Sequence, residues 1–289
     1  MDDGSTDDSL DLCRKYTVGD TRFVVLSQEN KGSSEARNLG LSRAMGSFIC
    51  FADVDDSFNE NYLADLMKLS QQGDLVIQGR IRVTDGKIKV IPVSNPGIYN
   101  LKDDPDTFFN HIDISNYGAP YCKLFSRDII KSNHILFSTK ILVAEDFDFL
   151  IRYLACCDRV VLDDRANYHY IDNKGSLSTR LYSFEKEYYG LRQIDSSWQL
   201  LNNCFHCRSL EPIYGKTIAY HVYRSICGIY QSSLGKKERI RRLERLYQEY
   251  GVLYKHYRKP ETLFLRCGKS LFCLKQFNIF DLIMNRKLK

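Results

Sequence analysis

Short apolar runs alternate with amphipathic segments along the first 90 residues of the chain. Apolar residues three and four positions apart indicate helices, whereas continuous β-branched and aromatic runs indicate strands that are buried on both faces. The predicted helices cover residues 7–16, 33–46 and 59–72, and the predicted strands cover residues 22–27, 47–53 and 74–83. This alternation is typical of an open α/β sheet with mainly parallel strands.

The pattern changes twice in the rest of the chain. Residues 94–120 are rich in Pro, Asn, Gly and Asp, which predicts loops with one short helix. Stretches with strand-like or helical patterns follow at residues 121–132, 144–157, 159–164 and 167–172. The last two indicate a closing pair of strands, and from about residue 180 onward the pattern is helical without an evident repeat. We therefore predict an α/β domain over residues 1–180 and an α-helical C-terminal extension over residues 181–289.

Charge is distributed unevenly along the chain. The net charge is +5, with acidic clusters in the N-terminal half and basic segments at residues 236–250 and 285–289. The basic segment at 236–250 is either a solvated helix that packs through its apolar side or a helix attracted to an anionic membrane surface. The sequence contains no basic patch interleaved with aromatic residues, so it gives no indication of nucleic-acid binding. Ten cysteines without a secretory signal indicate free thiols, a reducing compartment and a cytoplasmic protein.

An acidic cluster follows the apolar strand that is predicted at residues 47–53. Asp53, Asp55 and Asp56 are crowded at the end of this strand, and neighbouring carboxylates repel one another unless a cation is present. Hard divalent cations such as Mg²⁺ or Mn²⁺ prefer oxygen ligands and often bridge to substrate phosphates. The alternative is a solvated acidic turn that caps the next helix, and spacing alone does not separate the two interpretations.

Three further groups of polar residues could take part in chemistry. The opening segment, with Asp3 and Gly4, has the composition of a turn between a strand and a helix. Glu145 and Asp146 begin a predicted helix, where acids also complement the helix dipole without any other role. Arg37 is either a phosphate ligand or an ordinary surface cation.

Taken together, five segments resemble the family 2 glycosyltransferases, which have the GT-A fold. The matching segments, in the order and spacing of the family, are residues 2–9, 30–56, 123–130, 144–154 and 168–179. The resemblance covers roughly residues 1–180 and implies a Rossmann-like mixed sheet flanked by helices. It also implies that the chain lacks the family's first strand–helix–strand unit, which leaves the predicted strand at 22–27 as an exposed edge.

The resemblance assigns donor-binding roles to four positions. Asp3, in the turn with Gly4, matches the acid that contacts the nucleotide base, and Arg37 falls in a segment near the nucleotide. Asp53 and Asp55 form an Asp-x-Asp element for the ribose and for a divalent metal, Mn²⁺ or Mg²⁺, on the diphosphate. Asp55 is the expected direct metal ligand.

The resemblance also implies an inverting single displacement. Asp146 matches the general base, with Glu145 as its neighbour, and takes a proton from the acceptor hydroxyl that attacks the sugar. His169, Tyr170 and Ser176 match the far wall of the donor or acceptor site. Such a base needs partial burial to raise its pKa toward neutrality.

The expected function is therefore metal-dependent transfer of a hexose from a nucleotide-diphosphate sugar, expected to be a UDP-sugar. The implied acceptor is a glycan or a lipid-linked glycan of bacterial surface polysaccharide biosynthesis, at the inner face of the cytoplasmic membrane, with peripheral membrane contact. The apparent N-terminal gap has two explanations: a start site upstream of Met1, or a real fragment with weakened activity. The 289-residue chain as it stands is expected to bind nucleotide-sugar weakly and to be poorly soluble. The alternative function is that of a catalytically impaired homologue acting as a binding or scaffolding subunit.

Overall fold

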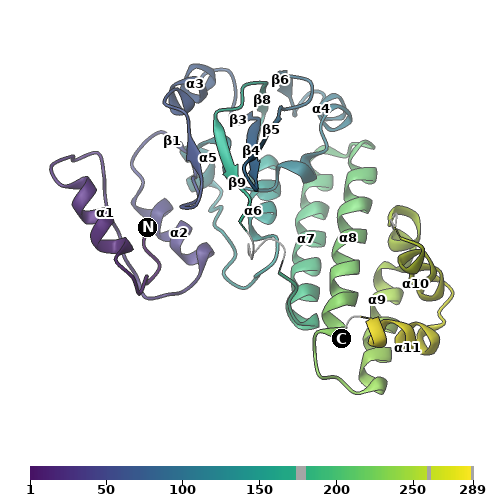
Figure 1. The fold of residues 1–289 in the computed structure, drawn as a ribbon. Helices are drawn as coiled ribbons and strands as arrows, with labels where there is room; N and C mark the ends of the chain where they lie inside the picture. Colours follow the sequence, from purple (N-terminus) through teal and green to yellow (C-terminus); the bar gives the residue numbers. More distant parts are fainter. Residues whose placement is uncertain (174–179, 259–261, 288–289) are drawn as a thin grey trace.

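The computed structural model describes residues 1–173, 180–258 and 262–287, and its centre is a five-stranded mixed sheet (Figure 1). Its strands lie in the order β1 (Phe48–Ile49), β7 (Lys123–Ser126), β3 (Leu75–Gln78), β8 (Arg159–Asp163) and β6 (Gly97–Asn100). Only the β3–β8 pair in this sheet is parallel. The expectation of mainly parallel strands is therefore wrong, whereas the mixed sheet implied by the family resemblance is confirmed.

A second, four-stranded sheet lies beside the first. Its strands lie in the order β2 (Ser57–Phe58), β9 (Tyr168–Ile171), β4 (Arg80–Thr84) and β5 (Lys87–Ile91), with β4 and β9 parallel. The single strand predicted at residues 74–83 is divided between the two sheets at Gly79. A Cβ atom at Gly79 would lie 2.6 Å from the carbonyl oxygen of Ile91, so only glycine permits this close approach of the backbone.

Two other strand predictions differ from the structure. Residues 22–27 form no strand, and their one ladder contact among the described residues is a parallel bridge between Asp2 and Ser27. A β-branched run becomes a strand only beside a partner of similar length, and here Phe23 and Val24 are exposed. The runs at 159–164 and 167–172 form β8 and β9, which belong to different sheets and do not pair.

Helices cover the sheets on two sides (Figure 1). The first part of the chain contributes α1 (Ser9–Thr17), α2 (Ser33–Arg43), α3 (Tyr62–Leu69), α4 (Pro105–His111), α5 (Arg127–Ser132) and α6 (Glu145–Leu154), with a 3-10 turn, η1, at Ile114–Tyr117. The second part is helical, as predicted: α7 (Phe184–Phe205), α8 (Leu210–Tyr230), α9 (Lys236–Tyr257), α10 (Leu263–Cys273) and α11 (Phe277–Lys287). No helix of the described chain has the length and apolar character to cross a membrane.

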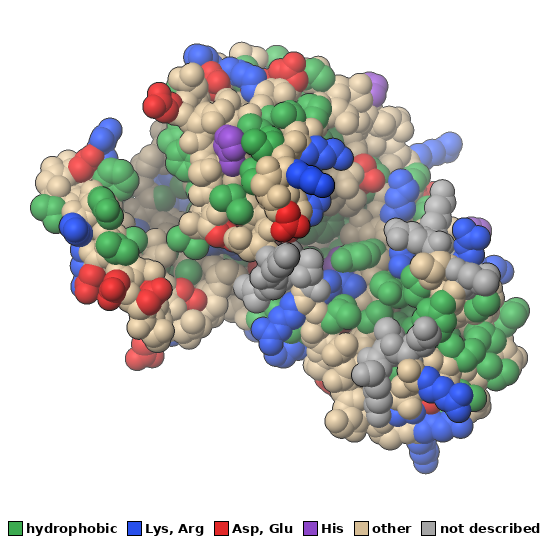
Figure 2. Space-filling model, viewed as in Figure 1, with side chains coloured by type: hydrophobic (Ala, Val, Ile, Leu, Met, Phe, Trp, Pro, Cys, Tyr) green, Lys and Arg blue, Asp and Glu red, His purple; other side chains and the backbone are tan. Residues whose placement is uncertain are grey.

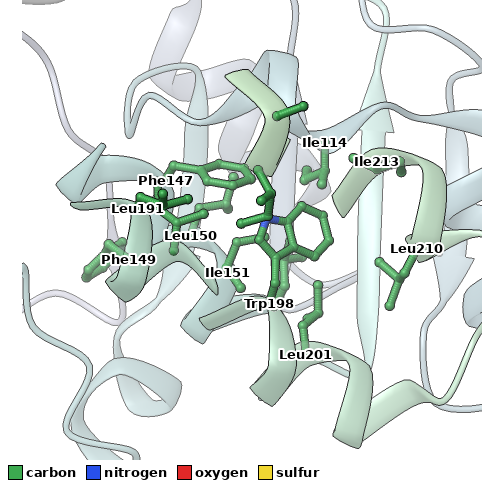
Figure 3. Close-up of a cluster of buried hydrophobic side chains, with 14 of the residues drawn as sticks. Ile114, Phe147, Phe149, Leu150, Ile151, Leu191, Trp198, Leu201, Leu210 and Ile213 are labelled. Carbon is green, nitrogen blue, oxygen red and sulfur yellow. The ribbon is translucent and has the colours of Figure 1, made fainter. Parts of the chain in front are cut away.

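One continuous hydrophobic core joins the sheet to the C-terminal helices. Trp198 of α7 is almost fully buried and packs against Phe147 of α6, and residues of both parts of the chain surround it (Figure 3). Buried hydrogen bonds fix the same contact, because the Asp148 carboxylate on α6 accepts from Ser197 and Gln193 on α7. The boundary near residue 180 stays a prediction, but no break in the core marks it.

The basic helix α9 packs through its apolar side, in agreement with one of the two interpretations of its sequence. Leu243 and Leu246 are fully buried in the core, whereas its Lys and Arg side chains are largely at the surface. Asp and Glu side chains are concentrated over the N-terminal helices, and Lys and Arg side chains predominate over the C-terminal helices (Figure 2). The surface thus keeps the charge asymmetry of the sequence. The cysteines form no disulfide within the described chain.

Candidate active site

A cleft of about 1040 Å³ lies between the α/β part of the molecule and α8. Its walls come from the start of α2, the turn after β1, the start of α6, the end of β9 and one face of α8. The predicted residues Arg37, Asp53, Asp55, Glu145 and Asp146 all line it. The fold thus brings together side chains that are up to 109 residues apart in the sequence.

Arg37 connects the acids of the cleft. Its guanidinium donates to Asp146 Oδ1 at 2.7 Å and to Asp53 Oδ1 at 3.0 Å, and it lies 3.9 Å from Glu145 Oε1. The Arg37 side chain is only 19% exposed, so water screens these contacts weakly. Arg37 therefore supplies the cation that this group of carboxylates requires.

The backbone at the start of α6 is strained next to these acids. Ala144, which precedes the helix, has a left-handed conformation with φ 60°, which is unfavourable for a residue with a Cβ atom. Glu145 and Asp146 follow this residue in the first turn of α6, and both line the cleft. Backbone strain of this kind is concentrated at functional sites.

Burial and the charges of the cleft raise the pKa of Asp146. Burial raises the pKa of Asp146 to about 7, and the negative charges of Glu145 and Asp53 act in the same direction. Arg37 opposes them, but it does not restore the usual value. Asp146 is therefore a carboxyl group that can both hold and release a proton near neutral pH.

Asp3 and Gly4 lie beside the cleft, and Asp3 binds the loop that forms its edge. The Asp3 carboxylate accepts hydrogen bonds from the backbone amides of Lys31 and Gly32, at 2.9 and 2.8 Å, and from the Gln28 side chain at 2.7 Å. Burial opposes but does not outweigh these bonds, which hold the pKa of Asp3 below its usual value. Gly4 has φ 74°, and a Cβ atom there would lie 2.7 Å from a backbone nitrogen.

The three acids after β1 point to different partners. Asp53 binds Arg37, whereas Asp56 turns away from the cleft and accepts from the Tyr168 hydroxyl and the Ile171 amide. Asp55 is exposed in the cleft, where it accepts only from the Asn173 side-chain amide among the described residues. No three metal-ligating side chains gather within the described ranges. One exposed carboxylate still fits Mg²⁺ or Mn²⁺, since these ions are often held by one or two carboxylates together with substrate phosphates.

An aromatic stack forms another wall, which sequence reasoning found only in part. Tyr121 stacks on Tyr168 at 4.8 Å and on Tyr170 at 5.6 Å between ring centroids, and Tyr121 and Tyr170 line the cleft. His169 points to the opposite face of β9, where its ring contacts Asn59. The predicted residue Ser176 lies outside the described residues. Tyr121 carried no signal in the sequence beyond its aromatic character.

Sequence reasoning missed the wall formed by α8. Tyr220, His221 and Arg224 line the cleft opposite the acids. Arg224 is neutralised by Glu187 in a buried ion pair of 2.7 Å. Burial and the nearby Arg224 lower the pKa of His221 to about 3, so its ring is neutral, and its Nδ1 has no hydrogen-bond partner among the described residues. No motif marks these residues, because only the packing of α8 brings them to the cleft.

Comparisons with known proteins agree with this architecture. The sequence profile of glycosyl transferase family 2 matches residues 1–133. The glycosyltransferase GlyG of Streptococcus pneumoniae is 43% identical over 75 residues, which are 26% of this chain and 25% of GlyG. EpsJ of Bacillus subtilis, an uncharacterized glycosyltransferase, is 28% identical over 182 residues, which are 62% of this chain and 53% of EpsJ. The match thus spans about half of EpsJ and a quarter of GlyG.

Solved structures show the same fold. Residues 1–349 of Staphylococcus aureus TarS in complex with UDP match with a TM-score of 0.67 and 20% identity, over 100% of this chain and 81% of that one. The complex of TarS with UDP-GlcNAc matches with a TM-score of 0.66 and 19% identity, over 99% and 81% of the two chains. At this identity the likeness establishes the fold, which is GT-A with a helical C-terminal region.

Proposed function

We propose that the chain transfers a sugar from a nucleotide-diphosphate sugar to an acceptor hydroxyl, because the profile of glycosyl transferase family 2 matches residues 1–133 and the fold is GT-A. The observation that carries this proposal is that Arg37 binds Asp146 on one side and Asp53 on the other. The pKa of Asp146 in this arrangement is raised to about 7. The proposed donor is a UDP-sugar, because the TarS structures that share the fold contain UDP and UDP-GlcNAc.

The proposed reaction is a single displacement with inversion at the anomeric carbon. Asp146 accepts the proton of the acceptor hydroxyl while that oxygen forms the new bond to the anomeric carbon. The bond from this carbon to the diphosphate oxygen breaks, and the diphosphate leaves with the bonding electrons. Arg37 stabilises the negative charge of the site and keeps a fraction of Asp146 deprotonated near neutral pH.

The donor side of the cleft consists of the remaining predicted residues. Asp3 and Gly4 hold the loop before α2, whose Lys31 and Gly32 line the cleft, so they shape the proposed nucleotide-binding edge. Asp55 is the proposed ligand of Mg²⁺ or Mn²⁺, which would neutralise the charge of the leaving diphosphate. We propose that Asp53 contributes to this side through Arg37.

The proposed acceptor is a glycan or lipid-linked glycan of bacterial surface polysaccharide biosynthesis, at the cytoplasmic face of the membrane. Exposed Leu274, Ile279 and Leu282 near the C-terminus support peripheral membrane contact, because they adjoin basic residues such as Lys275.

Asp146→Asn tests the proposal directly. We expect UDP release from UDP-GlcNAc and other UDP-sugars, assayed with Mn²⁺ or Mg²⁺, to fall by at least about 100-fold, because general-base catalysis contributes at least that much. Donor binding, measured by titration calorimetry, should change little. Asp128→Asn, the same change at an exposed position on α5, is the control.

Two results would contradict the proposal. Substantial turnover by Asp146→Asn would remove Asp146 from the role of base. Absence of turnover in the unmodified chain with every donor, together with retained donor binding, would favour the alternative of a binding or scaffolding subunit.

A further inference from the structure

A second hollow adjoins the cleft and lies between α8 and the C-terminal end of α9. It has a volume of about 490 Å³ and is lined by Lys216, Ala219, Tyr220, His256, Tyr257 and Arg258. We call it the outer hollow. Lys216 and Tyr220 line both the outer hollow and the cleft, so these two side chains form the ridge between them. A ligand that crosses this ridge would occupy both spaces.

The outer hollow carries a positive charge that the described residues only partly balance. The Arg258 guanidinium lies 4.3 Å from the centre of the Tyr223 ring, and no carboxylate of the described chain lies within salt-bridge distance of it. Its backbone is also fixed, because its carbonyl oxygen accepts from Lys269 Nζ at 2.7 Å. Arg258 is therefore a cation that lies against an aromatic ring and has a planar group suited to an oxyanion.

The other charges near the outer hollow are weaker. Lys216 lies 3.9 Å from Asp113, but its side chain is 57% exposed, so this contact balances its charge only weakly. The Tyr257 hydroxyl donates to the Glu211 carboxylate at 3.5 Å, so one acid also lies at the edge of the outer hollow. Among the described residues, Arg258 is thus the cation of the outer hollow that has no carboxylate partner.

The inner side of the ridge has a different chemistry. There Arg224 is already paired with Glu187, and His221 is only 6% exposed and has an Nδ1 atom without a hydrogen-bond partner in the described part of the chain. A neutral ring and hydroxyl groups suit the hydroxyls of a sugar, whereas the outer hollow suits an anion. Tyr220 is about half exposed between them and offers an aromatic face for a sugar ring.

We propose that the outer hollow binds an oxyanion, a phosphodiester or a carboxylate, that the acceptor glycan carries next to the sugar lying across the Lys216–Tyr220 ridge. This inference rests on the proposed function, since it assigns the α8 side of the cleft to the acceptor. Asp53, Asp55 and Arg37 remain on the donor side, and Asp146 lies where the donor and the acceptor hydroxyl meet. The acceptor is thus an anionic glycan whose charged group contacts Arg258.

Direct binding tests the inference without any turnover. The probes are a short glycerol phosphate oligomer and a short oligogalacturonate, each titrated into the full chain by calorimetry at about 0.15 M salt, where the Debye length is about 8 Å. We expect at least one to bind, and Arg258→Gln to weaken that binding about tenfold, because it removes a charge-assisted hydrogen bond to the anion. The probe that binds identifies the oxyanion as phosphodiester or carboxylate.

The matched control is Lys237→Gln. Lys237 is an exposed cation at the opposite end of α9 from His256, and 19 residues of helix separate the two positions by roughly 30 Å. This variant loses one positive charge, as Arg258→Gln does, and we expect its affinity for the probes to stay within about twofold of the unmodified chain, because salt screens distant surface charges. Binding of UDP-GlcNAc should be unchanged in both variants.

Three results would overturn the inference. They are binding of neither oligomer, equal weakening by both substitutions, and weakened UDP-GlcNAc binding in Arg258→Gln, which would place the donor in the outer hollow. Binding of phosphatidylglycerol vesicles that depends on Arg258, without binding of either oligomer, would assign the hollow to a membrane lipid instead. If an oligomer binds as expected but no UDP-sugar is turned over, the anion site stands and the proposed transferase function fails.

Discussion

Removal of the Arg37 charge should raise the pKa of Asp146 further. In Arg37→Gln, the carboxylates of Asp53, Glu145 and Asp146 lose their shared cation while they remain in the cleft. Arg37 lowers the pKa of Asp146 in the folded protein, so its loss stabilises the protonated form of Asp146.

The expected rise in the pKa of Asp146 follows from its hydrogen bond with Arg37. The hydrogen bond from Arg37 to Asp146 is 2.7 Å long, and the two side chains are 19% and 26% exposed. A hydrogen bond to a charged group contributes roughly 1.5–3 kcal/mol, and partial exposure favours the lower end of this range. One pKa unit corresponds to about 1.4 kcal/mol, so we expect a rise of about one unit, from near 7 to near 8.

Two measurements check this shift. A carboxyl-carbon NMR titration of labelled aspartate, with Asp146→Asn to assign the signal, reports the pKa directly. The acidic limb of the pH profile of turnover at saturating donor should move upward by the same amount, since the deprotonated carboxylate is the active form. Arg37→Lys keeps the positive charge and should show a smaller shift. An unchanged or lowered pKa in Arg37→Gln would refute the electrostatic account of the cleft.

Two predictions concern stability. The folded-state pKa of Asp146 lies above its usual value of 3.8, so the stability that this group contributes is present at low pH and is lost as the pH rises through about 7. Asp146→Asn should therefore raise Tm above pH 7 and change it little near pH 4, and a larger gain at pH 4 would contradict this assignment. Trp198→Ala should lower the free energy of unfolding in urea by about 3–5 kcal/mol, since it empties a buried site, whereas the exposed Leu200→Ala should cost less than about 0.5 kcal/mol. Equal losses in these two variants would contradict the packing described for α7.

The candidate residues on the acidic side of the cleft could be named from the sequence, because they lie in short segments with distinctive local patterns. Arg37, Asp53 and Asp146 were each ambiguous alone, since a surface cation or a solvated acid has the same local pattern. Their hydrogen bonds show that the three segments meet in one place. Their individual roles stay proposals, because contacts within the protein do not identify a substrate.

Other features depended on contacts that the sequence does not display. The apolar run at residues 74–83 looks like one strand, but the close approach of Ile91 at Gly79 divides it between two sheets. The β-branched run at 22–27 lacks a partner of matching length among the described residues. His221 and Tyr220 belong to an ordinary helical pattern, and only tertiary packing directs them to the cleft.

The shared core around Trp198 has a consequence for protein engineering. The surface of α7 that covers Phe147 and Leu150 is continuous with the α8 wall that we assign to the acceptor. A chimera that exchanges the C-terminal helices with those of a relative at residue 180 would join two unmatched surfaces. A chimera made to change acceptor preference therefore has to exchange α6 as well, or carry substitutions on the face of α7 that match it to α6.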